Sequence, residues 1–180
     1  MRHAGGGYGA PIMDWEGKVE NPKLVCAGSG SAIAPGAAFF ASLVYEAGVF
    51  VRRDWSAEAW ETQDHLRFLS WWRQKAPVVG EERRRAIDIE ALIRIFASLK
   101  DAKERPKQCF CYIVVLFLMR AKKLRFVESA HVGERSWIVV EDRAQGVVHR
   151  VRDPQMSNDE LDAVQRNLLE VVAAVDEIEA

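Results

Sequence analysis

The sequence is poor in cysteine, and its cysteines are not arranged as a disulfide framework. Among 180 residues only three are cysteine, namely Cys26, Cys109 and Cys111. Because the count is odd and two of the three lie within one apolar stretch, we expect free thiols and a reducing, cytoplasmic setting. Residues 1–23 contain no apolar segment of the kind found in signal peptides, and their glycines indicate a flexible leader.

Motifs of catalysis and nucleotide binding are also missing. The sequence has no G-x-S-x-G, no P-loop and no G-x-G-x-x-G. The cysteines at 109 and 111 are two residues apart, so on a helix they point to different sides, and burial would raise their pKa values. None of the four histidines has a partner at metal-ligand spacing: His3, His65, His131 and His149. We therefore predict a protein that is not an enzyme and carries no cofactor.

The overall charge is close to zero, but it is unevenly distributed. The net charge is −1, which gives no general attraction to nucleic acid or acidic membranes. Residues 83–125 contain twelve Lys and Arg against four Asp and Glu, whereas residues 153–180 contain eight acidic residues and one Arg. Either the acidic C-terminal helix neutralises the basic helices within the molecule, or the basic face is exposed to an anionic partner. The candidate anion-binding residues are Arg120, Lys122, Lys123 and Arg125.

The longest apolar run, Cys109–Met119, is too short to cross a membrane. As a helix its eleven residues would span about 16 Å, at roughly 1.5 Å per residue, whereas a membrane helix needs about 20 residues. The run Ile113–Val115 favours a strand, but Pro106 suits the first turn of a helix. We predict a core helix buried on nearly all sides, and no membrane association.

The first half of the chain contains a predicted β-hairpin. Two apolar strands, Phe39–Tyr45 and Val49–Arg53, flank a short connection with Gly48. A helical turn capped by Ser56 should follow. Residues 61–86 are predicted to form an aromatic linker helix and a solvated connector.

Trp71 and Trp72 lie within this predicted linker, and they allow two interpretations. The pair either anchors the first half of the chain onto the core of the second half, or forms a surface on which bases or ligands stack.

Residues 24–60 carry a resemblance to a known family. Residues 26–30 (CAGSG) precede the Pro35-Gly36 turn, and residues 53–60 (RDWSAEAW) close the hairpin. This order resembles a family of small uncharacterised bacterial proteins with an N-terminal zinc-ribbon-like segment. In that family Cys-x-x-Cys-Gly precedes a Pro-Gly turn and a hairpin ending in Arg-x-Asp-Tyr-Cys-x-x-Cys-Trp. The similarity continues through the helices and strands of the second half.

The resemblance implies that the metal ligands have mostly been lost. The corresponding positions are Cys26, Ser29, Ser56 and Ala59. Structural zinc requires four ligands, usually thiolate or imidazole, and three of these positions cannot supply one. We expect a metal-free hairpin in which Cys26 is a small buried residue rather than a nucleophile.

Residues 87–180 are predicted to form an α+β body. An amphipathic helix over 87–101 and the central helix are followed by a three-stranded antiparallel meander from Leu124 to Val151. Ser157 and Glu160 form a capping box that starts a last helix running to near Ile178. Its heptad-like apolar spacing suits packing on the domain's own core or dimerisation. The predicted fold class is α+β, with a metal-free zinc-ribbon-like hairpin, two helices, the meander and a C-terminal helix.

Two functional hypotheses follow from these features. The first is a non-catalytic protein-interaction or scaffold module whose partner is a protein of unknown identity. The second is a nucleic-acid-binding protein that uses the basic segment 83–125 in a winged-helix-like arrangement. Against the second hypothesis, the helix that would enter the groove, Cys109–Met119, has no polar face with which to contact base edges.

Overall fold

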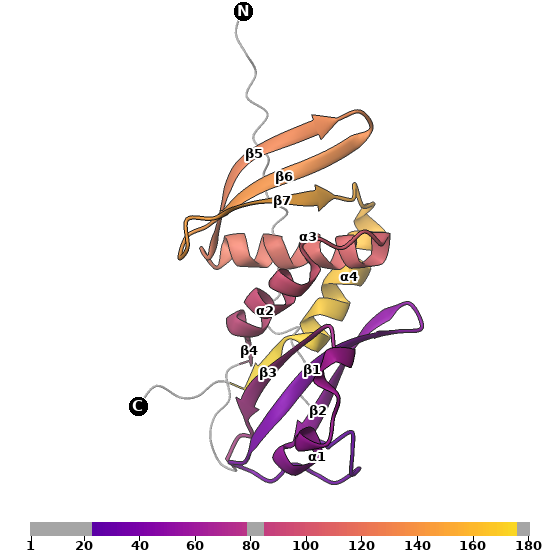
Figure 1. Cartoon of the computed structure of the whole chain (residues 1–180), viewed down its shortest axis with the longest axis vertical. Coiled ribbons are helices and arrows are strands. Elements are labelled where there is room, and N and C mark those ends of the chain that lie inside the picture. Colours follow the sequence, from indigo (N-terminus) through magenta and orange to yellow (C-terminus); the bar gives the residue numbers. More distant parts are fainter. Residues whose placement is uncertain (1–22, 79–84, 176–180) are drawn as a thin grey trace, which may run out of the picture.

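A computed structural model describes residues 23–78 and 85–175, and Figure 1 shows their elements stacked in layers. A three-stranded meander lies at one end, and helix α3 (Arg105–Arg120) crosses beneath it. Helices α2 (Ile89–Leu99) and α4 (Asn158–Val171) form the next layer, and a second three-stranded sheet lies below them. The fold is therefore α+β.

The lower sheet contains the predicted hairpin. Strands β1 (Ala38–Glu46) and β2 (Val49–Ser56) pair antiparallel, which confirms the hairpin. Ala47 and Gly48 connect them with φ of 49° and 85°, the positive values that a tight hairpin turn requires at both positions. Helix α1 (Ala57–Glu61) follows, and Ser56 accepts a hydrogen bond from the Ala59 N–H, as expected for its cap.

The predicted linker helix within residues 61–86 is wrong. A single 3₁₀ turn, η1 (His65–Arg67), precedes strand β3 (Ser70–Lys75), which pairs with β1 and completes the sheet in the order β2-β1-β3. The two-residue period of a strand applies here, because Trp72 is buried in the core while Trp71 is exposed on the opposite face. Trp72 is thus a core residue and Trp71 a surface residue.

Helices α2 and α3 confirm the two helices predicted for residues 87–120. Asp88 caps α2 through its side chain and the Ala91 N–H. Helix α3 is buried between the meander on one side and α2 and α4 on the other. Tyr112, Leu116 and Met119 form one half-buried face. The fully buried side chains cover the rest of the central run, as expected for a helix buried on nearly all sides: Cys109, Phe110, Cys111, Ile113, Val114, Val115, Phe117 and Leu118. Among the described residues no helix is long and apolar enough to cross a membrane.

The meander is also confirmed. Its strands are β5 (Leu124–Val132), β6 (Arg135–Asp142) and β7 (Val148–Asp153), paired in that order and antiparallel throughout. Ile138, Val140 and Val151 are buried between the sheet and the helices. The alternate positions of β6 and β7 therefore point to the outer face of the meander.

The last helix begins as predicted but ends earlier. Ser157 and Glu160 form the expected capping box, and α4 ends at Val171. Strand β8 (Ala173–Val175) then pairs with β4 (Arg85–Ile87), which begins at the end of the predicted connector. The heptad spacing could not reveal this end, because β4 supplies a backbone partner from a distant segment. The helical prediction beyond residue 175 and the connector over 79–84 lie outside the described residues, as does the leader up to residue 22.

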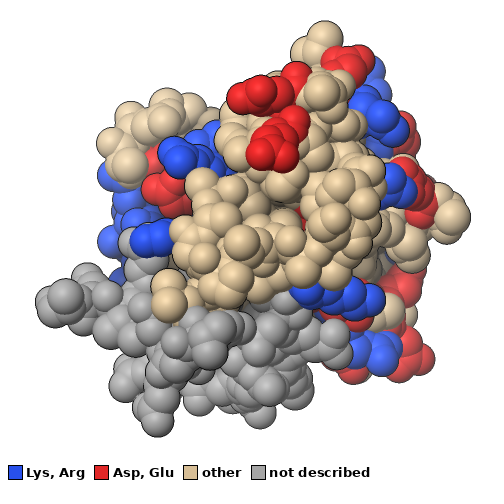
Figure 2. Space-filling view, turned by 90° about the horizontal axis from the view of Figure 1, so that it is seen from below, with Lys and Arg blue, Asp and Glu red and all other residues tan. Residues whose placement is uncertain are grey.

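Two clusters of buried side chains lie on opposite faces of the lower sheet. The larger cluster joins that sheet, through Phe39 and Trp72, to α2, α3, α4 and the meander. The smaller one, built on Val44, Trp55, Trp60 and Phe68, lies beneath α1 and η1. Figure 2 looks onto this end of the molecule, and the described part of the face carries few charged side chains over its centre. The charged candidate sites are therefore to be sought elsewhere.

Candidate functional site

The four positions that the resemblance assigns to metal ligands lie close together in a corner beside the start of α1. In this cysteine corner, defined by Cys26, Ser29, Ser56 and Ala59, the Cys26 thiol donates to Ser56 Oγ at 3.5 Å. The Ser56 N–H donates to Cys26 Sγ at 3.3 Å. A Cβ placed on Gly28 would lie only 3.1 Å from the Ala59 Cβ. The turn that carries Cys26 is therefore packed directly against the α1 segment.

Hydrogen bonding gives the Cys26 thiol an unusual acidity for a buried group. The side chain is 1% exposed. Burial raises its pKa, but hydrogen bonds with Ser29 and Ser56 outweigh burial and bring the pKa to about 6. Across residues 23–78 and 85–175, no three His, Cys, Asp or Glu side chains are grouped so that they could hold a metal ion. The arrangement is a closed, hydrogen-bonded corner.

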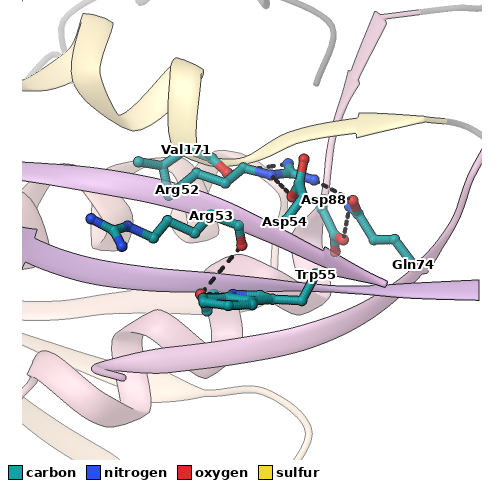
Figure 3. A network of polar contacts seen from close by, with 8 residues as sticks. Arg52, Arg53, Asp54, Trp55, Gln74, Asp88 and Val171 are labelled. Atoms are coloured by element: carbon teal, nitrogen blue, oxygen red, sulfur yellow. Dashed lines mark hydrogen bonds and ion pairs between the residues drawn. The ribbon is translucent and has the colours of Figure 1, made fainter. Parts of the chain in front are cut away.

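A second closed site is the network centred on Arg52 that Figure 3 shows. Arg52 Nε bonds Asp54 Oδ1 at 2.8 Å, and both side chains are less than one tenth exposed. Arg52 Nη2 donates to Gln74 Oε1 at 2.6 Å, and Gln74 Nε2 donates to Asp88 Oδ2 at 2.9 Å. Arg52 Nη1 also donates to the Val171 carbonyl at 3.4 Å. This Arg52 network joins β2, β3, the cap of α2 and the end of α4.

The chemistry of the Arg52 network is that of a structural ion pair. Burial raises the pKa of Asp54, and the charge of Arg52 together with its hydrogen bond opposes that rise. The guanidinium reaches a carboxylate, an amide oxygen and a backbone carbonyl, so its donors face protein acceptors. Neither Arg52 nor Asp54 lines the cavity of about 580 Å³ or the cavity of about 620 Å³ that are described below. We assign the network to stability.

The candidate anion-binding residues predicted from the sequence do not form an enclosed site. Arg120 is the last residue of α3, and Lys122 and Lys123 are exposed in the turn that follows. Arg125, on β5, pairs with Glu141 across the outer face of the meander. One of the four cations is thus already bound by a carboxylate, and the proposed role of the remaining residues stays a prediction.

A larger group of cationic side chains lies between the α2–α3 loop and the meander. We call this cavity of about 580 Å³ the basic pocket. Five cationic side chains and one carboxylate line it: Lys100, Lys103, Arg135, Arg150, Arg152 and Asp101. The rest of its lining is Leu99, Ala102, Gln108, Cys111, Trp137 and Val151.

Trp137 forms the centre of the cationic wall. It projects from β6 onto the outer face of the meander, directly opposite Arg152 on β7. The Arg150 guanidinium lies 4.6 Å from the centre of the indole ring and that of Arg152 lies 5.3 Å from it, both at cation–π distance. The indole therefore fixes two guanidinium groups side by side without neutralising either charge.

Few carboxylates balance this wall. Lys100 pairs with Asp101 at 2.5 Å, and Arg152 donates to the Ser136 carbonyl at 3.3 Å. Within the described parts of the chain, Lys103, Arg135 and Arg150 form no ion pair. Three cations without carboxylate partners in one cavity give it the capacity to hold an anion.

An ion pair links the basic and acidic segments recognised in the sequence. Arg105 at the start of α3 pairs with Glu160 in the first turn of α4 at 3.1 Å. This pair borders a second cavity of about 620 Å³, which is lined mainly by the hairpin tip, α3 and α4. The basic pocket lies on the other side of α3 and retains its charge.

The two cysteines of α3 confirm the expectation of raised pKa values. Burial raises the pKa of the Cys111 thiol, at the base of the basic pocket, to about 12. Burial likewise raises the pKa of Cys109, which lines the second cavity. Their different cavities agree with the two-residue spacing, which was expected to point the thiols to different sides of the helix.

The charge count along the sequence includes only part of the basic pocket. It counted residues 83–125, of which Lys100 and Lys103 line the pocket, but Arg135, Arg150 and Arg152 lie outside that segment. A usable signal was present, because the Arg-Val-Arg sequence of residues 150–152 places two cations on the same face of a predicted strand. Their proximity to the α2–α3 loop depends on tertiary structure.

Comparisons with protein-family models, with curated proteins and with solved structures found no match.

Proposed function

We propose that this chain is a non-catalytic protein-interaction module that holds an acidic segment of its partner in the basic pocket. The observation that carries the proposal is the set of five cations against one carboxylate in a cavity of about 580 Å³. The cavity is of the size that proteins use for bound ligands, about 300–1,000 Å³. Its charge favours a partner with several carboxylates.

The arrangement of the cations supports recognition rather than solvation. Guanidinium groups bind carboxylates through two parallel hydrogen bonds, and Arg150 is held over Trp137 instead of moving freely in water. Lys103 contributes charge from the α2–α3 loop, and Arg135 contributes charge from β6. Bringing these like charges together is unfavourable in the free protein, and an acidic partner would relieve their repulsion.

Nucleic acid is the alternative that an experiment must separate from this proposal. The winged-helix hypothesis uses α3 as the helix that enters a groove, but α3 is enclosed by the meander, α2 and α4. Lys122 and Lys123 remain exposed and could contact phosphate. A binder of this kind would depend on those lysines rather than on the basic pocket.

The test is a titration of the full chain with poly-L-glutamate and, separately, with mixed-sequence single-stranded DNA. We expect saturable binding of poly-L-glutamate that weakens with salt, and at least a tenfold loss of affinity in R135E/R150E. The matched control K122E/K123E reverses two exposed charges outside the pocket and should bind like the wild type. Binding of DNA alone, or equal losses in both variants, would overturn the proposal.

A further inference from the structure

The free edge of β7 forms part of the basic pocket. β7 pairs with β6 on one side, and no described strand pairs with its other side. The pocket touches the consecutive residues Arg150, Val151 and Arg152. Because successive side chains of a strand point to opposite faces, a cavity that reaches all three must run along the strand's edge.

The register of the meander shows which backbone groups face that edge. The Asp142 N–H donates to the Val147 carbonyl at 2.8 Å, so these two residues form a hydrogen-bonded pair beyond the end of the ladder. In an antiparallel ladder such pairs alternate with pairs of residues whose backbone N–H and C=O groups point away from each other. From the pairing of Glu141 with Val148, the backbone groups of Val148, Arg150 and Arg152 therefore point away from β6.

These backbone groups are available to a partner. No described residue forms a backbone hydrogen bond with the N–H or carbonyl of Val148, Arg150 or Arg152 at the outer edge. The edge faces the space between β7 and the loop Leu99–Lys103, which is the cavity itself. An unpaired strand edge is a template for a further strand, and here it is flanked by cations.

On the basis of the proposed function, we propose that the partner's acidic segment binds as an additional β-strand along the free edge of β7. Main-chain hydrogen bonds to Arg150 and Arg152 would give affinity, and the side chains on either side would give specificity. This arrangement uses the backbone and the side chains of the same two residues.

The two faces of β7 define the sequence that fits. On the outer face the added strand would meet Arg150, Arg152 and Trp137, so its residues there should be acidic. On the inner face it would meet the side of Val151 and Leu99, which are both buried, so the alternate residues should be apolar. β7 has six residues and is about 20 Å long, which corresponds to a ligand of about six residues.

The test compares three peptides against the full chain by isothermal titration calorimetry. The first is Ac-Glu-Val-Glu-Val-Glu-Val-NH2, and the other two have the same sequence with N-methyl groups on one or the other alternate set of backbone amides. N-methylation keeps the charge but removes the N–H groups that pair with a strand edge. We expect the first peptide to bind. The N-methylated peptide whose methyl groups lie on the amides that face β7 should bind about tenfold or more weakly.

A pair of variants tests the same point from the protein side. R150P and R150Q both remove the charge, but only R150P also removes the backbone N–H of residue 150. Because that N–H points away from β6, proline leaves the hydrogen bonds between β6 and β7 intact. R150P should bind the first peptide less tightly than R150Q. If R150P does not fold, the N-methylated peptides decide the result.

The outcomes separate the inference from the proposed function. Equal affinity for the unmodified and both N-methylated peptides would overturn strand addition while leaving an acidic segment in the basic pocket. Failure of both the peptide and poly-L-glutamate to bind would overturn both. Retention of peptide binding in R135E/R150E would place the peptide elsewhere and also overturn the inference.

Discussion

Arg52 and Arg150 show how differently one residue type is used in two regions of this molecule. Arg52 lies in a closed network, where it contacts the Asp54 carboxylate, the Gln74 amide and the Val171 carbonyl. Arg150 lies over the Trp137 ring in an open cavity and forms no ion pair with a described residue. The charge of the first arginine is satisfied within the fold, whereas the charge of the second remains available to a ligand.

The cysteine corner belongs with the Arg52 network on the closed side of this comparison. Its polar groups are hydrogen-bonded to one another, and Cys26 is buried. Closed sites should respond to mutation through stability, and the open pocket should respond through binding. The following changes test that distinction in order of decreasing effect.

The largest effect is expected when the cysteine corner is converted to a metal site. In S29C/S56C/A59C, four thiols would occupy the positions that the family resemblance assigns to ligands. We expect one zinc ion per chain, with binding free energy on the order of 10 kcal/mol as in small structural zinc sites. Elemental analysis and thermal unfolding with and without a chelator measure it. Absence of zinc from this variant would contradict the resemblance.

Breaking the Arg52 network should be the most damaging single substitution among the polar residues. R52M leaves the buried Asp54 carboxylate without its cation, which should lower the free energy of unfolding by about 3–5 kcal/mol. The matched control R150M should change it by no more than about 0.5 kcal/mol, because that side chain is exposed. Urea denaturation measures both. Similar losses in the two variants would abolish the distinction between closed and open arginines.

The thiol of Cys26 should make stability depend on pH. Its pKa of about 6 in the fold lies below the ordinary thiol value of 9.0, so the unfolded chain binds more protons between these values. The contribution is complete above pH 9 and is lost as the pH falls through 6, and each pKa unit corresponds to about 1.4 kcal/mol. Relative to C26S, the wild type should gain stability from pH 6 to pH 9. Parallel pH profiles of the two proteins would show that Cys26 is not an acidic thiol.

The smallest effect is expected for the pocket in the absence of a ligand. Replacing Arg135 and Arg150 by methionine removes two like charges and should raise the free energy of unfolding by a few tenths of a kcal/mol at low salt. The gain should disappear at about 1 M salt, where the screening length is about 3 Å. A loss of more than about 1 kcal/mol would mean that the pocket arginines stabilise the fold, as Arg52 does.

Much of the fold could be predicted because its signals are local. The Gly48 turn, the Asp88 and Ser157 caps and the apolar run of α3 each depend on residues near one another in sequence. Strand β3 differs from the predicted linker helix because Leu66, Leu69 and Trp72 occur close to helical spacing although Trp72 lies in a strand. Strands β4 and β8 pair with each other although they lie at opposite ends of the second half of the sequence, so neither could be recognised alone.

The candidate site was harder to predict for the same reason. Trp137 and Arg152 are opposite each other only in the register of the meander, and Lys103 approaches them from the α2–α3 loop. Residue counts along the sequence placed the basic region between 83 and 125, although α3 buries much of that segment. Charge becomes informative about function only when its partners in the fold are known.

The most direct measurement is amide hydrogen exchange of the full chain with and without Ac-Glu-Val-Glu-Val-Glu-Val-NH2. If the acidic segment adds to β7, the amides of Arg150 and Arg152 should become protected when the peptide saturates the chain. The amide of Val151 faces β6 and serves as the internal reference, because it should change little. Peptide binding without added protection at Arg150 and Arg152 would contradict the account.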